Sequence, residues 1–327
     1  MAMLDRQLLE DLIAEARLAP SVHNIQPTRW RRDGDALLVL ADAACRLPVA
    51  DPLGHDVMLS HGAAIEGLSL ALGRRGLRIA QVDKATEEQG DIVARLVLAR
   101  GGEPDPLSAA VFDRASWRGP FRRGEPDLPQ RLADLAEAAG DLIVIHDKAI
   151  VAEVADLADR AAFHFLCDDA HRGELLHWMR LSRSDPRYGR DGLDAEALAL
   201  GRLEAAAASL VLGPLFPMLR RLGLAAPLTS ERGKLVSGGF ALFHRPSGED
   251  PLETGRAFYR DWLTMERLGL AACPVSVLVD FSPSNRELVR RCALPPDRRL
   301  VNVFRVGKPT RRPIARHARI DVGELIV

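Results

Sequence analysis

The sequence predicts an α+β fold, with two domain-sized halves or one large domain, and three observations support this prediction. Candidate helices, strands and a hairpin follow one another without regular strand–helix alternation, which favours α+β over a doubly wound parallel sheet. The chain has 327 residues, more than one average domain of roughly 100–200 residues. The glycine- and proline-rich run 101–106 has the composition of a boundary. We therefore expect an N-terminal half at 1–105 and a C-terminal half at 106–327.

Apolar spacing and turn residues define the elements of the first half. Leucines recur at helical spacing from Leu4 to Leu18, and Pro20 ends that helix. The turn Asp33-Gly34-Asp35 separates two apolar runs as in a hairpin. Small residues around Gly62 suit a helix that packs closely against another. The expected order is a helix at 4–18, a loop at 19–27, hairpin strands at 30–32 and 36–40, a helix at 57–72, and strands at 77–82 and 92–99.

The second half is expected to contain longer helices and an excursion. The polar loop 182–192 precedes an alanine-rich run that predicts a helix at 195–212. Glycines and prolines punctuate 213–233, and we expect a lid at about 183–233. The other expected elements are helices at 128–139, 150–169, 175–181 and 254–268, and strands at 141–145, 235–243 and 299–306.

Charge and cysteine content exclude several classes of protein. The 44 Lys+Arg residues balance 45 Asp+Glu, so no concentrated positive field is available for a nucleic acid or an anionic membrane. The four cysteines have no CxxC spacing, so neither a zinc cluster nor a disulfide framework is indicated. The N-terminus enters an amphipathic pattern and has no apolar signal region, so we expect a cytoplasmic protein.

Common catalytic and nucleotide-binding motifs are missing from the sequence. It has no G-x-G-x-x-G after a strand, no Walker A, no G-x-S-x-G and no H-E-x-x-H. His164, Asp168 and His171 would share a helical face, which is geometrically possible for a metal site. The polar face of a surface helix explains them better, so we expect no metal.

Two cationic clusters are candidates for binding one phosphate group. Arg114, Ser116 and Arg118 alternate ahead of Pro120, so two guanidinium groups and a hydroxyl can converge on an anion. The basic run 307–313, which includes Arg311 and Arg312, follows the last expected strand. It would close the same phosphate from the other side. The simpler alternative is that both clusters are exposed arginine-rich turns.

Two further segments have the character of recognition loops. Pro20, Ser21, Asn24 and Gln26 form a stiff polar loop that ends at Pro27. Amide side chains on such a loop suit the edge of a heterocycle, although local turn bonding explains them equally well. The segment Cys273-Pro274-Val275-Ser276 follows a helix that stops at a glycine.

Taken in order, these pieces resemble the FMN-dependent nitroreductase family, and most closely its tandem, Acg-like branch. The segment 114–118 is similar to the family's phosphate-binding R-R-S-x-R segment, and 20–27 to its P-S-x-x-N-x-Q-P loop. The stretch 268–274 resembles the one whose following backbone amides face the flavin, and 309–312 the C-terminal basic pair. The resemblance implies that FMN is held by Arg114, Ser116, Arg118, Arg311, Arg312, Pro20, Ser21, Asn24, Gln26, Pro274, Val275 and Ser276.

The order of the motifs departs from that of single-domain members of the family. Those members carry both motifs in one domain, with the arginine segment first, whereas each half of this chain holds only one of them. We therefore expect an intramolecular pseudo-dimer with central antiparallel or mixed sheets flanked by helices, and one FMN site at the junction. The chain would be a monomer or a homodimer.

The resemblance implies ping-pong hydride transfer from NAD(P)H to a nitro, quinone or enone acceptor. The flavin would carry the chemistry, so no side chain is assigned a catalytic role. Two alternatives stay open. One is a non-enzymatic FMN store with a lid over the flavin, and the other is a flavin-dependent dehydrogenase or oxidase of a specialised metabolite.

Overall fold

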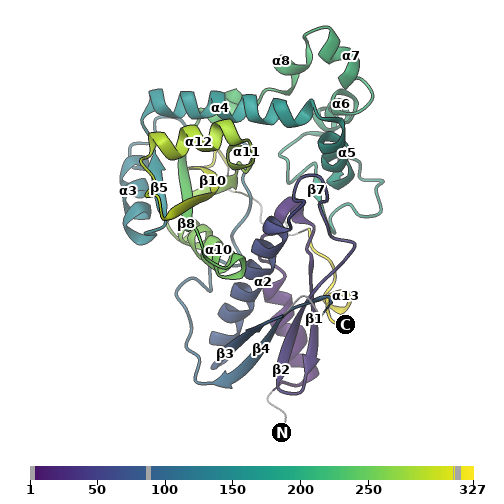
Figure 1. Cartoon of the computed structure of the whole chain (residues 1–327), viewed down its shortest axis with the longest axis vertical. Helices are drawn as coiled ribbons and strands as arrows, with labels where there is room; N and C mark the ends of the chain where they lie inside the picture. The colour runs from purple at the N-terminus through teal and green to yellow at the C-terminus, as the bar shows by residue number, and fades with distance from the viewer. Residues whose placement is uncertain (1–3, 86–89, 312, 314–317) are drawn as a thin grey trace.

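The computed structural model describes residues 4–85, 90–311, 313 and 318–327, and it contains two antiparallel sheets flanked by helices (Figure 1). Within these residues, no helix is long and apolar enough to cross a bilayer. The first sheet has the order β1-β2-β4-β3 and the second has the order β5-β8-β10-β9. The first sheet consists of β1 (Thr28–Asp33), β2 (Ala36–Ala41), β3 (Leu77–Lys84) and β4 (Ile92–Arg100). The second consists of β5 (Leu142–Ile145), β8 (Gly239–Pro246), β9 (Ala271–Pro274) and β10 (Arg298–Gly307).

The helices surround these sheets, and a short parallel pair of strands links two loops. That pair is β6 (Met179–Arg180) and β7 (Leu193–Asp194). The helices before β6 are α1 (Arg6–Ala16), the 3-10 turn η1 (Val22–Asn24), α2 (His55–Gly73), α3 (Leu128–Ala138), α4 (Lys148–Leu166) and α5 (Asp169–Trp178). Those after β7 are α6 (Arg202–Leu212), α7 (Phe216–Arg221), α8 (Ala225–Thr229), α9 (Arg232–Leu235), α10 (Pro251–Arg267), α11 (Val277–Asp280), α12 (Ser282–Arg291) and α13 (Val322–Leu325).

Helices α2 and α10 pack side by side between the two sheets (Figure 1). Their backbones touch at two glycines in a reciprocal way. A Cβ added to Gly62 would overlap the carbonyl of Leu252, and one added to Gly255 would overlap the carbonyl of Leu59. Each leucine lies three residues before the glycine of its own helix, which is the pattern of an isologous contact.

Each of these two helices also contributes to the core on the far side of the contact. Leu252, Tyr259 and Leu263 of α10 are buried in the cluster that contains the first sheet. Leu59 of α2 is buried with the residues of the second sheet. Each helix therefore packs into the apolar cores of both sheets, which couples the stability of the two sheets.

Several sequence-based expectations are confirmed. The helix expected at 57–72 is α2, and its small residues make the close contact that their size predicted. The hairpin is β1–β2, the last expected strand is β10, and the helix expected at 254–268 is α10. The α+β class is confirmed, with both large sheets purely antiparallel.

Other expectations were wrong in their bounds or their reasons. The helix expected at 195–212 begins only at Arg202, because Ala199 has a left-handed backbone (φ 56°) and the Glu204 side chain caps the Gly201 N–H. The run expected at 175–181 ends at Trp178 and turns into β6. In β10 residues 300–307 are all buried, as expected for a strand in the interior of the sheet.

We predict that Gly255→Ala lowers the free energy of unfolding by about 1–3 kcal/mol, because the new methyl group must push α2 and α10 apart. Urea denaturation measures this change. The matched control is Gly173→Ala in α5, where an added Cβ meets no atom within 4 Å. Removal of a helical glycine there should stabilise the chain by about 0.5–1 kcal/mol. An unchanged stability of Gly255→Ala would contradict the close α2–α10 contact.

Candidate functional site

The polar loop between α1 and β1 has an unusual backbone. His23, Asn24 and Gln26 all have positive φ values, at 44°, 56° and 51°. Residues other than glycine adopt this region at a cost and keep it only when surrounding contacts impose it. One such contact lies within the loop, where the Ser21 hydroxyl accepts from the Gln26 N–H (3.0 Å). A second comes from α2, where the Ser60 hydroxyl accepts from the Val22 N–H (3.1 Å).

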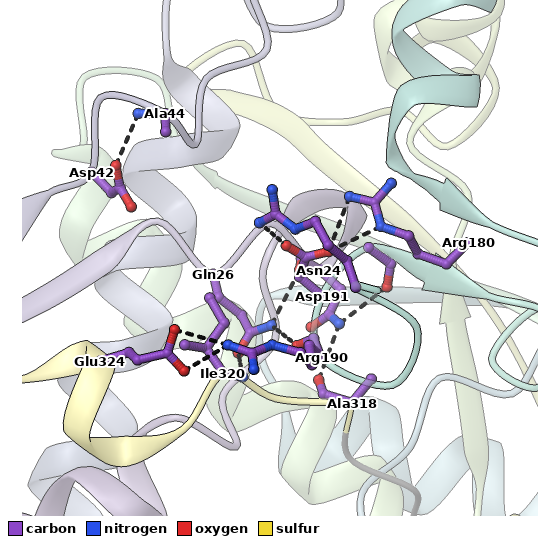
Figure 2. Close-up of polar contacts among 12 residues, drawn as sticks. Asn24, Gln26, Asp42, Ala44, Arg180, Arg190, Asp191, Ala318, Ile320 and Glu324 are labelled. Atoms are coloured by element: carbon purple, nitrogen blue, oxygen red, sulfur yellow. Dashed lines mark hydrogen bonds and ion pairs between the residues drawn. The ribbon is translucent and has the colours of Figure 1, made fainter. Parts of the chain in front are cut away.

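The amide side chains of this loop bind two segments that are distant in sequence (Figure 2). Asn24 Nδ2 donates to the carbonyls of Gly192 and Ala318, both at 3.1 Å. Gln26 Nε2 donates to the Arg190 carbonyl at 2.8 Å, and its Oε1 accepts from the Ile320 N–H at 2.9 Å. The loop is therefore clamped between residues 190–192 and the C-terminal segment 318–320.

Arg319 of the C-terminal segment adds further hydrogen bonds to the same loop. Its guanidinium donates to the carbonyls of Arg17 (2.5 Å), Leu18 (3.0 Å) and Ala19 (3.2 Å), and to Asn24 Oδ1 (2.8 Å). Burial, and then the positive charge of Arg114, lower the pKa of Arg319 to about 9. Our sequence analysis missed this residue, and no local motif marks it.

The segment 114–118 of the second half meets the same loop. The Arg114 guanidinium is buried, donates to the Leu18 carbonyl (2.8 Å) and lies 4.7 Å from the Trp262 ring centre. Burial lowers its pKa, and its Nε has no hydrogen-bond partner among the described residues. Such an orphaned donor is costly unless an acceptor reaches it.

Arg118 lies on the outer side of the junction. Its Nη1 donates to the Ala197 carbonyl at 3.1 Å. Its charge also reaches the loop of the first half, because burial first and Arg118 second lower the pKa of His23 to about 4. Arg118 and the polar loop therefore lie close together across the two halves.

The remaining predicted residues lie in several places, and two of them, Ser116 and Arg311, lie beside Trp117. Ser116 forms a parallel bridge with Ala272 of β9, and the Arg311 guanidinium lies 5.8 Å from the Trp117 ring centre. Pro274 ends β9, the Val275 N–H donates to the Val303 carbonyl (2.7 Å), and Ser276 precedes α11. Arg312 lies outside the described residues. Pro20 and Ser21 line a small cavity of about 30 Å³ beside α2.

Residues 190–197 form a strap across this junction. Besides the bonds to Asn24, Gln26 and Arg118, the strap is anchored by the buried Asp191, which pairs with Arg180 (3.0 Å) and Arg187. Residues 191–195 are all buried. The first part of the expected lid thus covers the polar loop, whereas α6–α8 lie farther out (Figure 1).

The histidine cluster of the sequence analysis has structural partners. The Asp168 carboxylate accepts from the N–H groups of Ala170 and His171 and caps α5. Glu174 accepts from the N–H groups of Val49 and Ala50. Within the described residues, no group of three or more His, Cys, Asp or Glu side chains is placed to hold a metal ion.

Comparisons with known proteins give a distant relationship. A curated protein from each of two Mycobacterium tuberculosis strains, CDC 1551 / Oshkosh and ATCC 25618 / H37Rv, is 23% identical over 296 residues. The match covers 88% of this chain and 80% of each relative, and both are provisionally named NAD(P)H nitroreductases. No protein-family model matches the chain. The chain is therefore a distant relative of proteins named as nitroreductases.

Solved structures give a weaker likeness. The FMN and NADPH-dependent nitroreductase NfnB from Sphigopyxis sp. strain HMH has a TM-score of 0.38 at 19% identity, over 68% of this chain and 98% of that one. The FMN-dependent NfnB from Mycobacterium smegmatis, solved in complex with NADPH, has a TM-score of 0.36 at 15% identity, over 66% and 94%. At these TM-scores the overlap does not establish a common fold.

We predict that Arg319→Ala lowers the free energy of unfolding by about 2–4 kcal/mol, because the carbonyls of Arg17 and Ala19 and the Asn24 Oδ1 lose their Arg319 donor. Chemical denaturation measures the loss. The control is Arg190→Ala, which removes an exposed ion pair from the strap to Glu324 and should cost less than about 1 kcal/mol. Equal losses in the two variants would show that Arg319 is no more important than a surface pair.

Proposed function

We propose that this protein is an FMN-binding oxidoreductase of nitroreductase type, with one flavin at the junction of an intramolecular pseudo-dimer. The observation that carries the proposal is the contact of segment 114–118 with the loop between α1 and β1, where Arg114 donates to the Leu18 carbonyl and the charge of Arg118 reaches His23. The relationship to proteins named as NAD(P)H nitroreductases supports it over most of the chain. The reciprocal contact of α2 and α10 is what a fused dimer would have.

The cations at the junction fit the phosphate of FMN. Within the described residues, no carboxylate forms an ion pair with Arg118 or Arg311, and Arg114 has an unpartnered Nε. Arg114 is buried, Arg118 is half-buried and Arg311 is exposed. Guanidinium groups without an acid partner favour binding of a phosphate dianion through charge-assisted bonds. We assign the phosphate to these three arginines and Ser116, with Arg312 as a further candidate.

The loops would position the flavin ring from two sides. Pro274, Val275 and Ser276 are proposed to border its pyrimidine edge, and since the Val275 N–H is already bonded to Val303, Ser276 is the better donor. Pro20 and Ser21 are proposed to border the ribityl chain. Asn24 and Gln26 already bind the strap and the C-terminal segment, so their proposed part is to hold the loop in shape.

The proposed reaction is hydride transfer from NAD(P)H to a nitro, quinone or enone acceptor, and bound FMN would supply that redox chemistry. The chain would hold the cofactor, orient it and keep water from its buried side. No side chain of the chain needs to act as an acid or a base.

The strap favours a second candidate function. Because residues 190–197 lie over the polar loop and bond to Arg118, a flavin beneath them would be shielded from a nicotinamide donor. The chain would then store or sequester FMN without turning over. Anaerobic mixing of the flavin-loaded protein with NADH and NADPH separates the two functions. Bleaching of the flavin absorbance supports the oxidoreductase, and bound flavin that does not bleach supports the store.

We predict that Arg118→Ala combined with Arg311→Ala weakens FMN binding at least about a hundredfold, since each lost charge-assisted bond costs about 1.5–3 kcal/mol. Titration of the apoprotein with FMN measures the dissociation constant. The control is Arg286→Ala, which removes an exposed arginine from α12 and should leave the constant unchanged. Equal affinity in the double variant and the native protein would rule out this phosphate site.

A further inference from the structure

The excursion α6–α8 exposes an unusual amount of apolar surface. Seven of the ten exposed large apolar side chains of the described residues lie between 203 and 228. Figure 1 shows these helices beyond the end of α4, away from both sheets. Proteins seldom leave so many neighbouring apolar side chains in water unless another surface covers them. The seven are Leu203, Leu210, Leu215, Met218, Leu222, Leu224 and Leu228.

Helix α6 has an inner face that is already packed. Ala205 is buried, and Val211 packs against a small cluster that includes Phe216 of α7 and Phe163 of α4. This cluster holds the excursion on the rest of the second half. The opposite face of α6 is therefore a true outer surface of the chain.

The outer face of α6 is a continuous apolar stripe. Leu203, Ala206, Ala207 and Leu210 are spaced three, four and seven residues apart, so they share one side of the helix. All four are exposed, with Leu203 at 88% and Leu210 at 53%. The stripe contains no charged residue, since Arg202 and Glu204 flank it at one end.

The stripe reads the same in both directions. Its leucines lie at the two ends, and its alanines lie on either side of the midpoint between 206 and 207. If two such helices cross antiparallel about a two-fold axis at this midpoint, Leu203 of one meets Leu210 of the other. The alanines at the centre allow the helices to approach closely. The two Arg202 side chains then lie at opposite ends of the seam, so no like charges meet.

We propose that the outer face of α6 binds a second copy of this chain, with the two α6 helices antiparallel about a two-fold axis at residues 206 and 207. The self-complementary stripe favours a second copy over an anionic membrane, because the stripe has no charged residue and the charges of Arg202 and Glu204, which flank it, cancel. This interface is separate from the α2–α10 contact, and it does not depend on the proposed flavin site.

The test is the mass of the full chain in solution, measured by light scattering during size-exclusion chromatography at tens of micromolar. The native chain should have about twice its 35.8 kDa mass. Leu203→Glu combined with Leu210→Glu should weaken the dimer at least about a hundredfold and elute as a monomer. Both side chains are exposed, so an unchanged circular dichroism spectrum is expected for this variant.

The matched control is Leu53→Glu, which places the same change on a 78% exposed leucine outside the excursion. It should leave the dimer intact. A monomeric native chain would overturn the proposal, and so would a dimer that survives the α6 variant.

Cysteine cross-linking tests the antiparallel register. A cysteine at Ala206 or Ala207 lies beside the proposed axis, so mild oxidation should link two chains within minutes, whereas Leu53→Cys and the native chain should stay unlinked. The native cysteines serve as the background, and two of them, Cys45 and Cys273, are buried. A dimer that does not cross-link at either alanine would overturn the proposed axis. Anionic vesicles that bind a monomeric native chain would assign the face to lipid instead.

Discussion

The reciprocal contact of α2 and α10 determines where every other part of the chain lies. Gly62 and Gly255 let two backbones touch, and no larger residue fits at either position without separating the helices. The contact is reinforced by the buried Glu66, which pairs with Arg256 (2.9 Å) and Arg260 (2.7 Å) of α10. α10 also packs into the core of the first sheet, and α2 packs into the core of the second. The orientation of the two sheets is therefore fixed, and the loops between them come together.

That junction collects features that cost free energy to maintain. Three residues of the loop adopt left-handed backbone. Arg114 is buried, Arg319 beside it is half-buried, and no carboxylate is bonded to either in the described residues. A chain keeps such strain and charge only when other contacts compensate or when the site has a use. The strap and the C-terminal segment supply the compensating hydrogen bonds, and the proposed phosphate would supply the missing negative charge.

Features made by residues that are contiguous in sequence could be predicted, and features that depend on partners distant in sequence could not. The small residues of α2 and the polar loop 20–27 are contiguous in sequence, so their spacing and residue types were informative. Arg319 could not be found in this way, because it bonds to main-chain carbonyls some 300 residues earlier. Every residue has such a carbonyl, so no side-chain pattern marks these partners. The path of residues 195–201 was not predicted because an alanine-rich run predicts helix. In the structure residues 195–199 form turns, Ala199 has a left-handed backbone, and Arg118 bonds to the Ala197 carbonyl.

We propose that two incomplete halves form one cofactor site. The direct measurement is the number of flavins bound per chain after the purified protein is reconstituted with excess FMN and the free flavin is removed. We predict one FMN per chain, released as intact FMN on denaturation. Two per chain would mean that each half holds its own site, and none would mean that the junction is purely structural, so either result would contradict it.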